Sequence, residues 1–73
     1  MTDRIHVDIA SPPDRERLVA QIMVGNQQWA EVNQEGDSLQ LKTYPRQDGR
    51  AWVLGFDDAI DSLAFARKRL TGE

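Results

Sequence analysis

A glycine–asparagine pair, Gly25-Asn26, separates two runs of residues that favour β-strands, 18–24 and 27–33. Such a pair between strand-like runs is typical of a two-residue β-hairpin turn. The turn places the two strands side by side and antiparallel. It also starts a register, in which Val24 lies opposite Gln27 and Ile22 lies opposite Trp29. This pair therefore limits the chain to folds that contain a β-hairpin in its first half.

Two further runs continue the same pattern. Residues 38–44 alternate in polarity after the turn at 34–37, and residues 51–56 follow a longer loop at 45–50 that contains Asp48-Gly49. Both connections have hairpin length, so the sequence predicts four antiparallel strands that neighbour one another in chain order.

A helix is predicted over residues 57–71. Asp57 or Asp58 can cap its start by accepting a free backbone N–H, and the basic run 67–69 suits the negative end of the helix dipole. Gly72 suits the left-handed position just past the last turn. Start, stop and charge signals agree on this element.

The N-terminal segment, residues 1–16, contains a short alternation of apolar Ile5, Val7 and Ile9 with polar His6 and Asp8, which makes it a candidate edge strand. The prolines at 12 and 13 then interrupt regular structure. The predicted fold is α+β: a four-stranded antiparallel meander packed on one C-terminal helix, with the N-terminal segment as a candidate fifth strand. Residues 17–73 would form this single domain, since a chain of 73 residues builds only one small core.

The hairpin registers sort the strand residues onto two faces. The face predicted to meet the helix holds Val19, Met23, Ala30, Val32, Leu39, Leu41, Trp52, Leu54 and Phe56. The helix would cover it with Ala59, Ile60, Leu63, Ala66 and Leu70. The opposite face would carry a second apolar set: Ala20, Ile22, Val24, Trp29, Lys42, Tyr44 and Val53.

An apolar patch of this kind usually marks an interaction site. Three occupants remain open for it: the N-terminal segment folded back, a second copy of the chain, or a different protein. Phe65 lies about 160° away from the apolar stripe of the helix, which gives it either an ordinary exposed position or a role in docking.

Composition narrows the chemistry. The chain has no cysteine and one histidine, His6, so it lacks the residues for most nucleophilic and metal sites. Asp57, Asp58 and Asp61 are explained by the start of the helix, without an ion. A net charge of −3 with no basic stripe disfavours nucleic acid as a partner. We therefore expect a cytoplasmic protein that is not an enzyme, with no catalytic residue, cofactor, metal site or membrane segment.

Several stretches resemble a family of small uncharacterised bacterial proteins. They are the run from Gln28 to Gly36, then Tyr44-Pro45-Arg46 with Asp48-Gly49 and Trp52, and then Phe56-Asp57-Asp58-Ala59. The resemblance covers roughly residues 18–71. It implies a bacterial cytoplasmic protein with an interaction role, and no activity comes with it.

The leading hypothesis for function is a non-enzymatic interaction module that self-associates or binds a protein partner. One version is an inhibitor or immunity-type protein whose acidic surface blocks a basic partner. The predicted interaction residues are Ile22, Val24, Trp29, Lys42, Tyr44, Val53 and Phe65. The alternative is a domain that binds a small ligand or single-stranded nucleic acid through Trp29, Lys42, Tyr44 and Arg46, where aromatic rings and cations would contact bases and phosphates.

Overall fold

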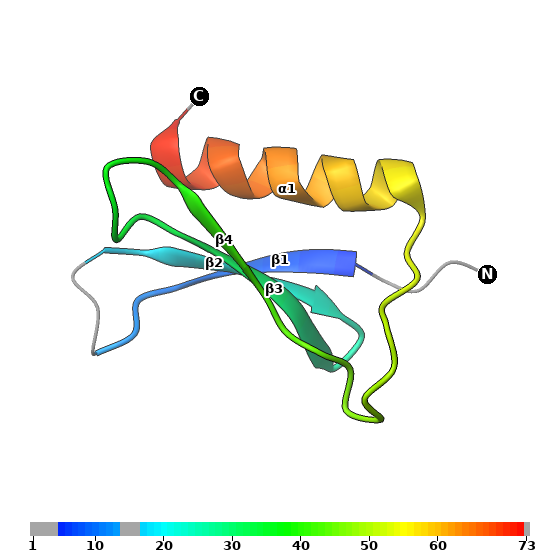
Figure 1. Cartoon of the computed structure of the whole chain (residues 1–73). Helices are drawn as coiled ribbons and strands as arrows, with labels where there is room; N and C mark the ends of the chain where they lie inside the picture. The colour runs from blue at the N-terminus through cyan, green and yellow to red at the C-terminus, as the bar shows by residue number, and fades with distance from the viewer. Residues whose placement is uncertain (1–4, 14–16, 73) are drawn as a thin grey trace.

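The structure is a four-stranded antiparallel sheet with one helix along one of its faces (Figure 1). It is a computed structural model, and it describes residues 5–13 and 17–72. The elements are β1 (Ile5–Ala10), β2 (Val19–Val24), β3 (Gln27–Asn33), β4 (Gln40–Thr43) and α1 (Phe56–Thr71). The strands follow one another across the sheet in chain order. The helix packs on β1 and β2, reaches β3, and leaves β4 without a helix above it. The predicted α+β meander on a C-terminal helix is thereby confirmed.

The strands are not all those that the sequence predicts. The candidate strand in the N-terminal segment is confirmed as β1, which pairs with β2 from Ile5↔Val24 to Ala10↔Val19. It extends the sheet in its own plane and does not fold over a face. The predicted strand at 51–56 is wrong, because residues 51–55 have no strand structure and Phe56 already begins the helix.

A β-bulge in β3 decides which face each residue takes. The turn at Gly25 has a φ of 63°, and Val24 pairs with Gln27 as predicted. The register then shifts between Met23, which pairs with Gln28, and Ile22, which pairs with Ala30. Trp29 is the extra residue and has no partner on β2. A one-residue slip moves side chains to the other face, so the rest of β2 is turned over relative to the predicted register.

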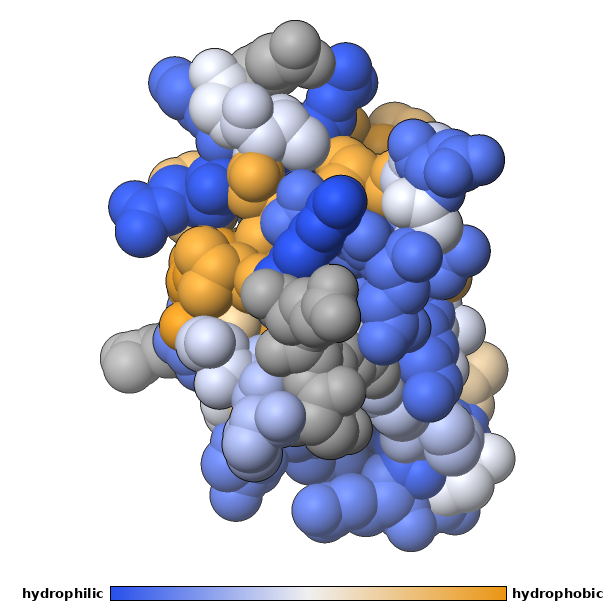
Figure 2. Space-filling view, turned by 90° about the vertical axis from the view of Figure 1, so that its left-hand side faces the viewer, coloured by the Kyte–Doolittle hydropathy of each residue, from blue (hydrophilic) through white to orange (hydrophobic). Residues whose placement is uncertain are grey.

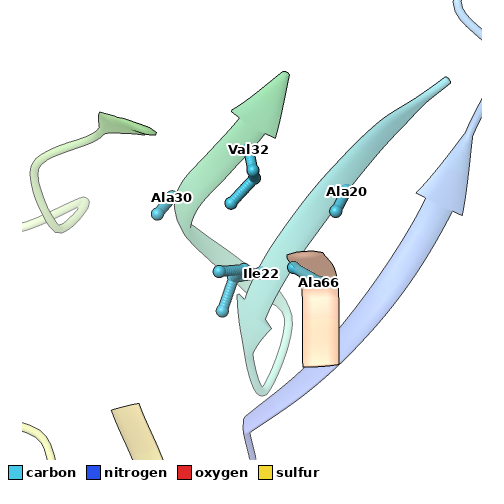
Figure 3. Packing of buried hydrophobic residues seen from close by; sticks show 5 residues of the cluster. All are labelled: Ala20, Ile22, Ala30, Val32 and Ala66. Atoms are coloured by element: carbon cyan, nitrogen blue, oxygen red, sulfur yellow. The ribbon is translucent and has the colours of Figure 1, made fainter. Parts of the chain in front are cut away.

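The core lies between the sheet and α1 (Figure 3). Ile22 and Ala20 of β2, Ala30 and Val32 of β3, and Ala66 of the helix form its fully buried centre. Half-buried apolar residues pack around this centre, among them Ile5, Val7 and Ile9 from β1. The bulge makes this core possible, because it brings the apolar residues of β2 onto the same side as Ala30 and Val32.

The helix starts and sits differently from the prediction. Gly55 occupies the N-cap position and no side chain caps the helix; Asp57 and Asp58 lie inside the first turn instead. The end is as predicted: Gly72 has a φ of 79° and its N–H donates to the carbonyl of Lys68 at 2.7 Å. The buried stripe contains Ser62 and Ala66, whereas Ile60, predicted to be buried, is 48% exposed.

The face of the sheet away from the helix is mainly polar. Asp8, Gln21, Glu31 and Lys42 form a row across the four strands on this side. In Figure 2, where the helix layer is at the top, hydrophobic residues lie among hydrophilic ones in the upper half and the lower half is mainly hydrophilic. The second apolar face predicted from the sequence is therefore absent from the described residues, although Val19 is buried on this side.

Candidate functional site: an aromatic–cation cluster beside β4

Tyr44 directly follows β4 and is held against the bulge of β3. Its backbone N–H donates to the carbonyl of Trp29 at 2.8 Å. The ammonium of Lys42, two residues earlier, lies 5.3 Å from the centre of the Tyr44 ring. This distance is within the range of a cation–π interaction. The end of β4 therefore brings the Tyr44 ring and the Lys42 cation together, beside the backbone of the bulge.

Trp52 reaches the same place from the chain segment that returns to the helix. Its indole Nε1 donates to the carbonyl of Tyr44 at 2.8 Å, and the guanidinium of Arg46 lies 5.6 Å from the centre of its ring. We call Lys42, Tyr44, Arg46 and Trp52 the aromatic–cation cluster, and both of its aromatic residues are half-buried. Trp29 meets it through its backbone carbonyl, while its side chain packs against the core.

The loop at 45–50 is ordered by its own short hydrogen bonds. The carboxylate of Asp48 accepts from the N–H of Arg50 at 3.0 Å and lies 3.5 Å from Nη2 of Arg46. The N–H of Gly49 donates to the Arg46 carbonyl at 2.9 Å, in a turn that needs the φ of 79° found at Gly49. Gln27 accepts from the N–H of Gln47 at 3.1 Å. These contacts hold Arg46 over Trp52.

Three apolar side chains near the cluster along the chain are exposed to solvent. Val53 is 84% exposed and Phe56 is 78% exposed. Leu41, on β4, is 52% exposed, because the helix stops short of this strand. Single exposed apolar residues are common, but Val53 directly follows Trp52, a ring of the cluster. The combination makes this region the candidate functional site.

The predicted interaction residues do not share one surface. Ile22 and Val24 are buried, with 0% and 7% of their surface exposed, so their predicted place on an uncovered face is wrong. The bulge is the reason, because it turns both side chains toward the helix. Trp29 also packs against the core and is only half-exposed.

The remaining predicted residues lie in two places. Lys42, Tyr44 and Val53 lie in or beside the aromatic–cation cluster. Phe65 lies on the helix near β1, at the edge of the sheet opposite to β4, and is 49% exposed. Of the four residues of the alternative hypothesis, Lys42 and Tyr44 lie together, Arg46 lies over Trp52, and Trp29 contributes its backbone carbonyl.

Sequence reasoning missed two residues of this region. Trp52 and Phe56 were both assigned to the core through a strand at 51–56 that does not form. A signal was present, because Pro45 directly follows Tyr44 and has no N–H to offer to a hairpin ladder. That signal indicates that β4 ends at this point and that the chain leaves the sheet.

Within 5–13 and 17–72, no group of three or more potential metal ligands lies together. His6 lies far along the sheet on β1, with Nε2 3.3 Å from the carboxylate of Asp8. No helix in the described part of the chain is long and apolar enough to cross a membrane.

Comparison with known proteins adds no relative to this picture. No protein-family model, curated protein or solved structure matches the chain. The resemblance to a family of small bacterial proteins stays a prediction, and the function has to be argued from the geometry alone.

Proposed function

We propose that this chain is a non-enzymatic interaction module that binds a protein partner through the aromatic–cation cluster and the exposed Val53 and Phe56. The observation that carries the proposal is the 84% exposure of Val53, which directly follows Trp52, the ring over which the Arg46 guanidinium lies. Phe56, 78% exposed, follows at the start of the helix. Tryptophan, tyrosine and arginine are the residues most enriched at the energetic centres of protein interfaces. The aromatic residues are held in place before binding, which lowers the entropy lost on association.

Local charge defines the kind of partner. Arg46 and Arg50 lie on the loop that leads to Trp52 and Val53, and the carboxylate of Asp48, which is near both, balances only part of that positive charge. A partner surface that carries aliphatic side chains and carboxylates would complement Val53 and these cations. At Phe56 the charge is opposite, because Asp57 and Asp58 follow it in the first turn of the helix, so the partner would offer a cation there.

Nucleic acid fits the same cluster less well. Binding of single strands relies on free aromatic faces and a positively charged groove. Here Lys42 and Arg46 already lie over the rings of Tyr44 and Trp52, and Asp48 adds a negative charge beside Arg46. These contacts favour a protein over a nucleic-acid strand.

A site-specific crosslink tests the proposal. A photoreactive residue at position 53 should join the chain to one defined partner in the cell, and the same residue at Ser38, in an exposed turn, should not. With the purified partner, Val53→Asp and Phe56→Asp should each weaken binding at least about tenfold, as expected for truncation of an interface centre. Ser38→Asp is the control with the same change in charge. A partner whose affinity is equal for all four chains would overturn the proposal.

A second candidate function is binding of a small ligand or single-stranded nucleic acid by Trp29, Lys42, Tyr44 and Arg46. The observation that favours it is the pairing of two rings with two cations in one cluster. A titration of labelled single-stranded oligonucleotides at low and high salt separates the two functions. Binding that falls with salt and is lost in Tyr44→Ala would favour nucleic acid, whereas absence of binding at low salt would exclude it.

A further inference from the structure

The two edges of the sheet differ in how open they are. β4 has four residues, carries Lys42, and is followed at once by Pro45. Short length, lysine and proline are the usual means by which proteins protect a sheet edge from pairing. β1 has six residues, Ile5–Ala10, with neither lysine nor proline among them, and it pairs on one side only. The outer edge of β1 is therefore the edge that can accept another strand.

A groove runs between this open edge and the helix. It has a volume of about 590 Å³ and is lined by Ile5, His6, Val7, Asp58, Asp61, Ser62 and Phe65. Phe65 stands at its wall and is 49% exposed, although it belongs to a helix whose neighbouring positions Ser62 and Ala66 are buried. The strand edge, the groove and Phe65 form one continuous surface, which we call the β1-edge surface.

We propose that the occupant of the β1-edge surface is a second copy of this chain, whose β1 pairs antiparallel with the first about a two-fold axis at Val7. In that register each residue pairs with the residue that lies equally far from Val7 on its other side. His6 then lies opposite Asp8 of the second copy, and Ile5 lies opposite Ile9. Directly opposed polar side chains that can hydrogen-bond, and opposed aliphatic side chains, are favourable cross-strand pairs.

The two faces of the new pair match the two faces of the sheet. Val7 pairs with Ile22, which lies in the core, so the apolar residues of β1 face the helix layer. His6 and Asp8 pair with Met23 and Gln21 on the polar face. Within one chain, His6 and Asp8 already lie 3.3 Å apart, and the dimer would join two such pairs into a four-membered row.

The helix layer fits the same axis. The helix lies over β1 and β2 together, and adjacent strands are about 4.8 Å apart, so two copies would place their helix axes about 10 Å apart. This is the distance at which helices pack through their side chains. Figure 1 shows α1 running along β1, so Phe65 of each copy would lie near the seam.

Charge supports an antiparallel pair of helices. The two-fold axis reverses the second helix, so the acidic first turn of one copy, with Asp57 and Asp58, would lie beside the basic last turn of the other, with Lys68 and Arg69. Antiparallel helix dipoles add to this attraction. The pairing would also leave both aromatic–cation clusters free at the two outer ends of a continuous eight-stranded sheet, so binding at the clusters can be tested separately from pairing at β1.

The oligomeric state in solution tests this proposal directly. The wild-type chain should be a dimer by sedimentation equilibrium at micromolar concentration. Phe65→Glu, at an exposed position, should keep the circular dichroism of the fold and weaken dimerisation at least about tenfold. The matched control is Ala64→Glu, at the preceding helix position, which is also exposed; it should leave the dimer intact. A wild-type chain that stays monomeric up to millimolar concentration would overturn the proposal.

Crosslinking distinguishes this edge from the other one. The chain has no cysteine, so single-cysteine variants report one position each. Val7→Cys should form a disulfide-linked dimer under mild oxidation, because residues directly opposed across a two-fold axis bring their Cα atoms within disulfide range. Lys42→Cys, on β4, should remain monomeric. Faster crosslinking through position 42 than through position 7 would show that the wrong edge was chosen.

Discussion

The indole Nε1 of Trp52 donates a 2.8 Å hydrogen bond to the backbone carbonyl of Tyr44. The side chain of Trp52 thus ties the segment that returns to the helix to the end of β4, where the sequence predicts a further strand. The same contact positions Arg46 over the indole and leaves Val53 in water.

Trp52→Phe is expected to lower the free energy of unfolding by about 1 kcal/mol, the usual net value of one such hydrogen bond. The loss is larger if no water molecule replaces the indole as donor to the Tyr44 carbonyl. The ring volume is largely kept, so the sheet should remain intact by circular dichroism. Urea denaturation at neutral pH measures the effect. Tyr44→Phe is the control, because it keeps the carbonyl that accepts the bond. Equal stability of Trp52→Phe and wild type would show that the contact does not hold the segment in solution.

Ile22→Ala should lower the free energy of unfolding by about 2–5 kcal/mol, because Ile22 is fully buried and its removal leaves a cavity. Met23→Ala should lower it much less, since Met23 is on the polar face and only half-buried. Thermal or urea unfolding of the two variants compares them. The hairpin register without a bulge gives the reverse order, with Met23 in the core, so a larger loss for Met23→Ala would contradict the bulge.

Much of the fold could be predicted from the sequence because its signals are local. The turn at Gly25-Asn26, the alternation of Ile5, Val7 and Ile9, and the helix end at Gly72 each depend on a few neighbouring residues. The bulge at Trp29 could not be found in this way. Its cause is tertiary, since it places the apolar residues of β2 and β3 on the same side, under the helix.

The candidate site was predicted only in part, for the same reason. Lys42, Tyr44 and Arg46 follow from the sequence as an aromatic–cation group, and the structure does place Lys42 against the Tyr44 ring, but Arg46 lies over Trp52. Ile22 and Val24 were assigned to a surface because one extra residue in β3 was not expected. An error of one position in a strand exchanges core for surface, whereas the same error at a helix end changes little.

Gly72→Ala should destabilise the chain by about 1 kcal/mol, because a residue with a Cβ is strained at the left-handed φ of 79° found there. No neighbouring atom would meet the added Cβ, so the effect would come from the backbone alone. Thermal unfolding of Gly72→Ala and Gly72→Asn tests whether the loss comes from the backbone conformation. Asparagine tolerates this conformation and should recover part of the loss; an alanine variant as stable as wild type would mean that the C-cap does not form.

A buried polar pair on the face away from the helix gives the last prediction. Asn33, 4% exposed, donates through Nδ2 to the carboxylate of Glu31 at 3.1 Å, and its Oδ1 accepts from the N–H of Glu35 at 3.2 Å. One side chain thus joins β3 to the turn that follows it. Asn33→Ala should lower the free energy of unfolding by about 1–3 kcal/mol, the range for a polar group left without its partner in a buried place.

Asn33→Asp separates this hydrogen bond from simple packing. The change keeps the size of the side chain but replaces the donor by an acceptor, so two carboxylates would face each other where Asn33 and Glu31 meet at 3.1 Å. Like charges at this distance repel, and burial strengthens the repulsion. At neutral pH, urea denaturation should therefore find Asn33→Asp less stable than Asn33→Ala. If the aspartate variant equals wild type while Ser38→Ala, the exposed control in the same turn, is also unchanged, the Nδ2 donor has no part in holding the turn to β3.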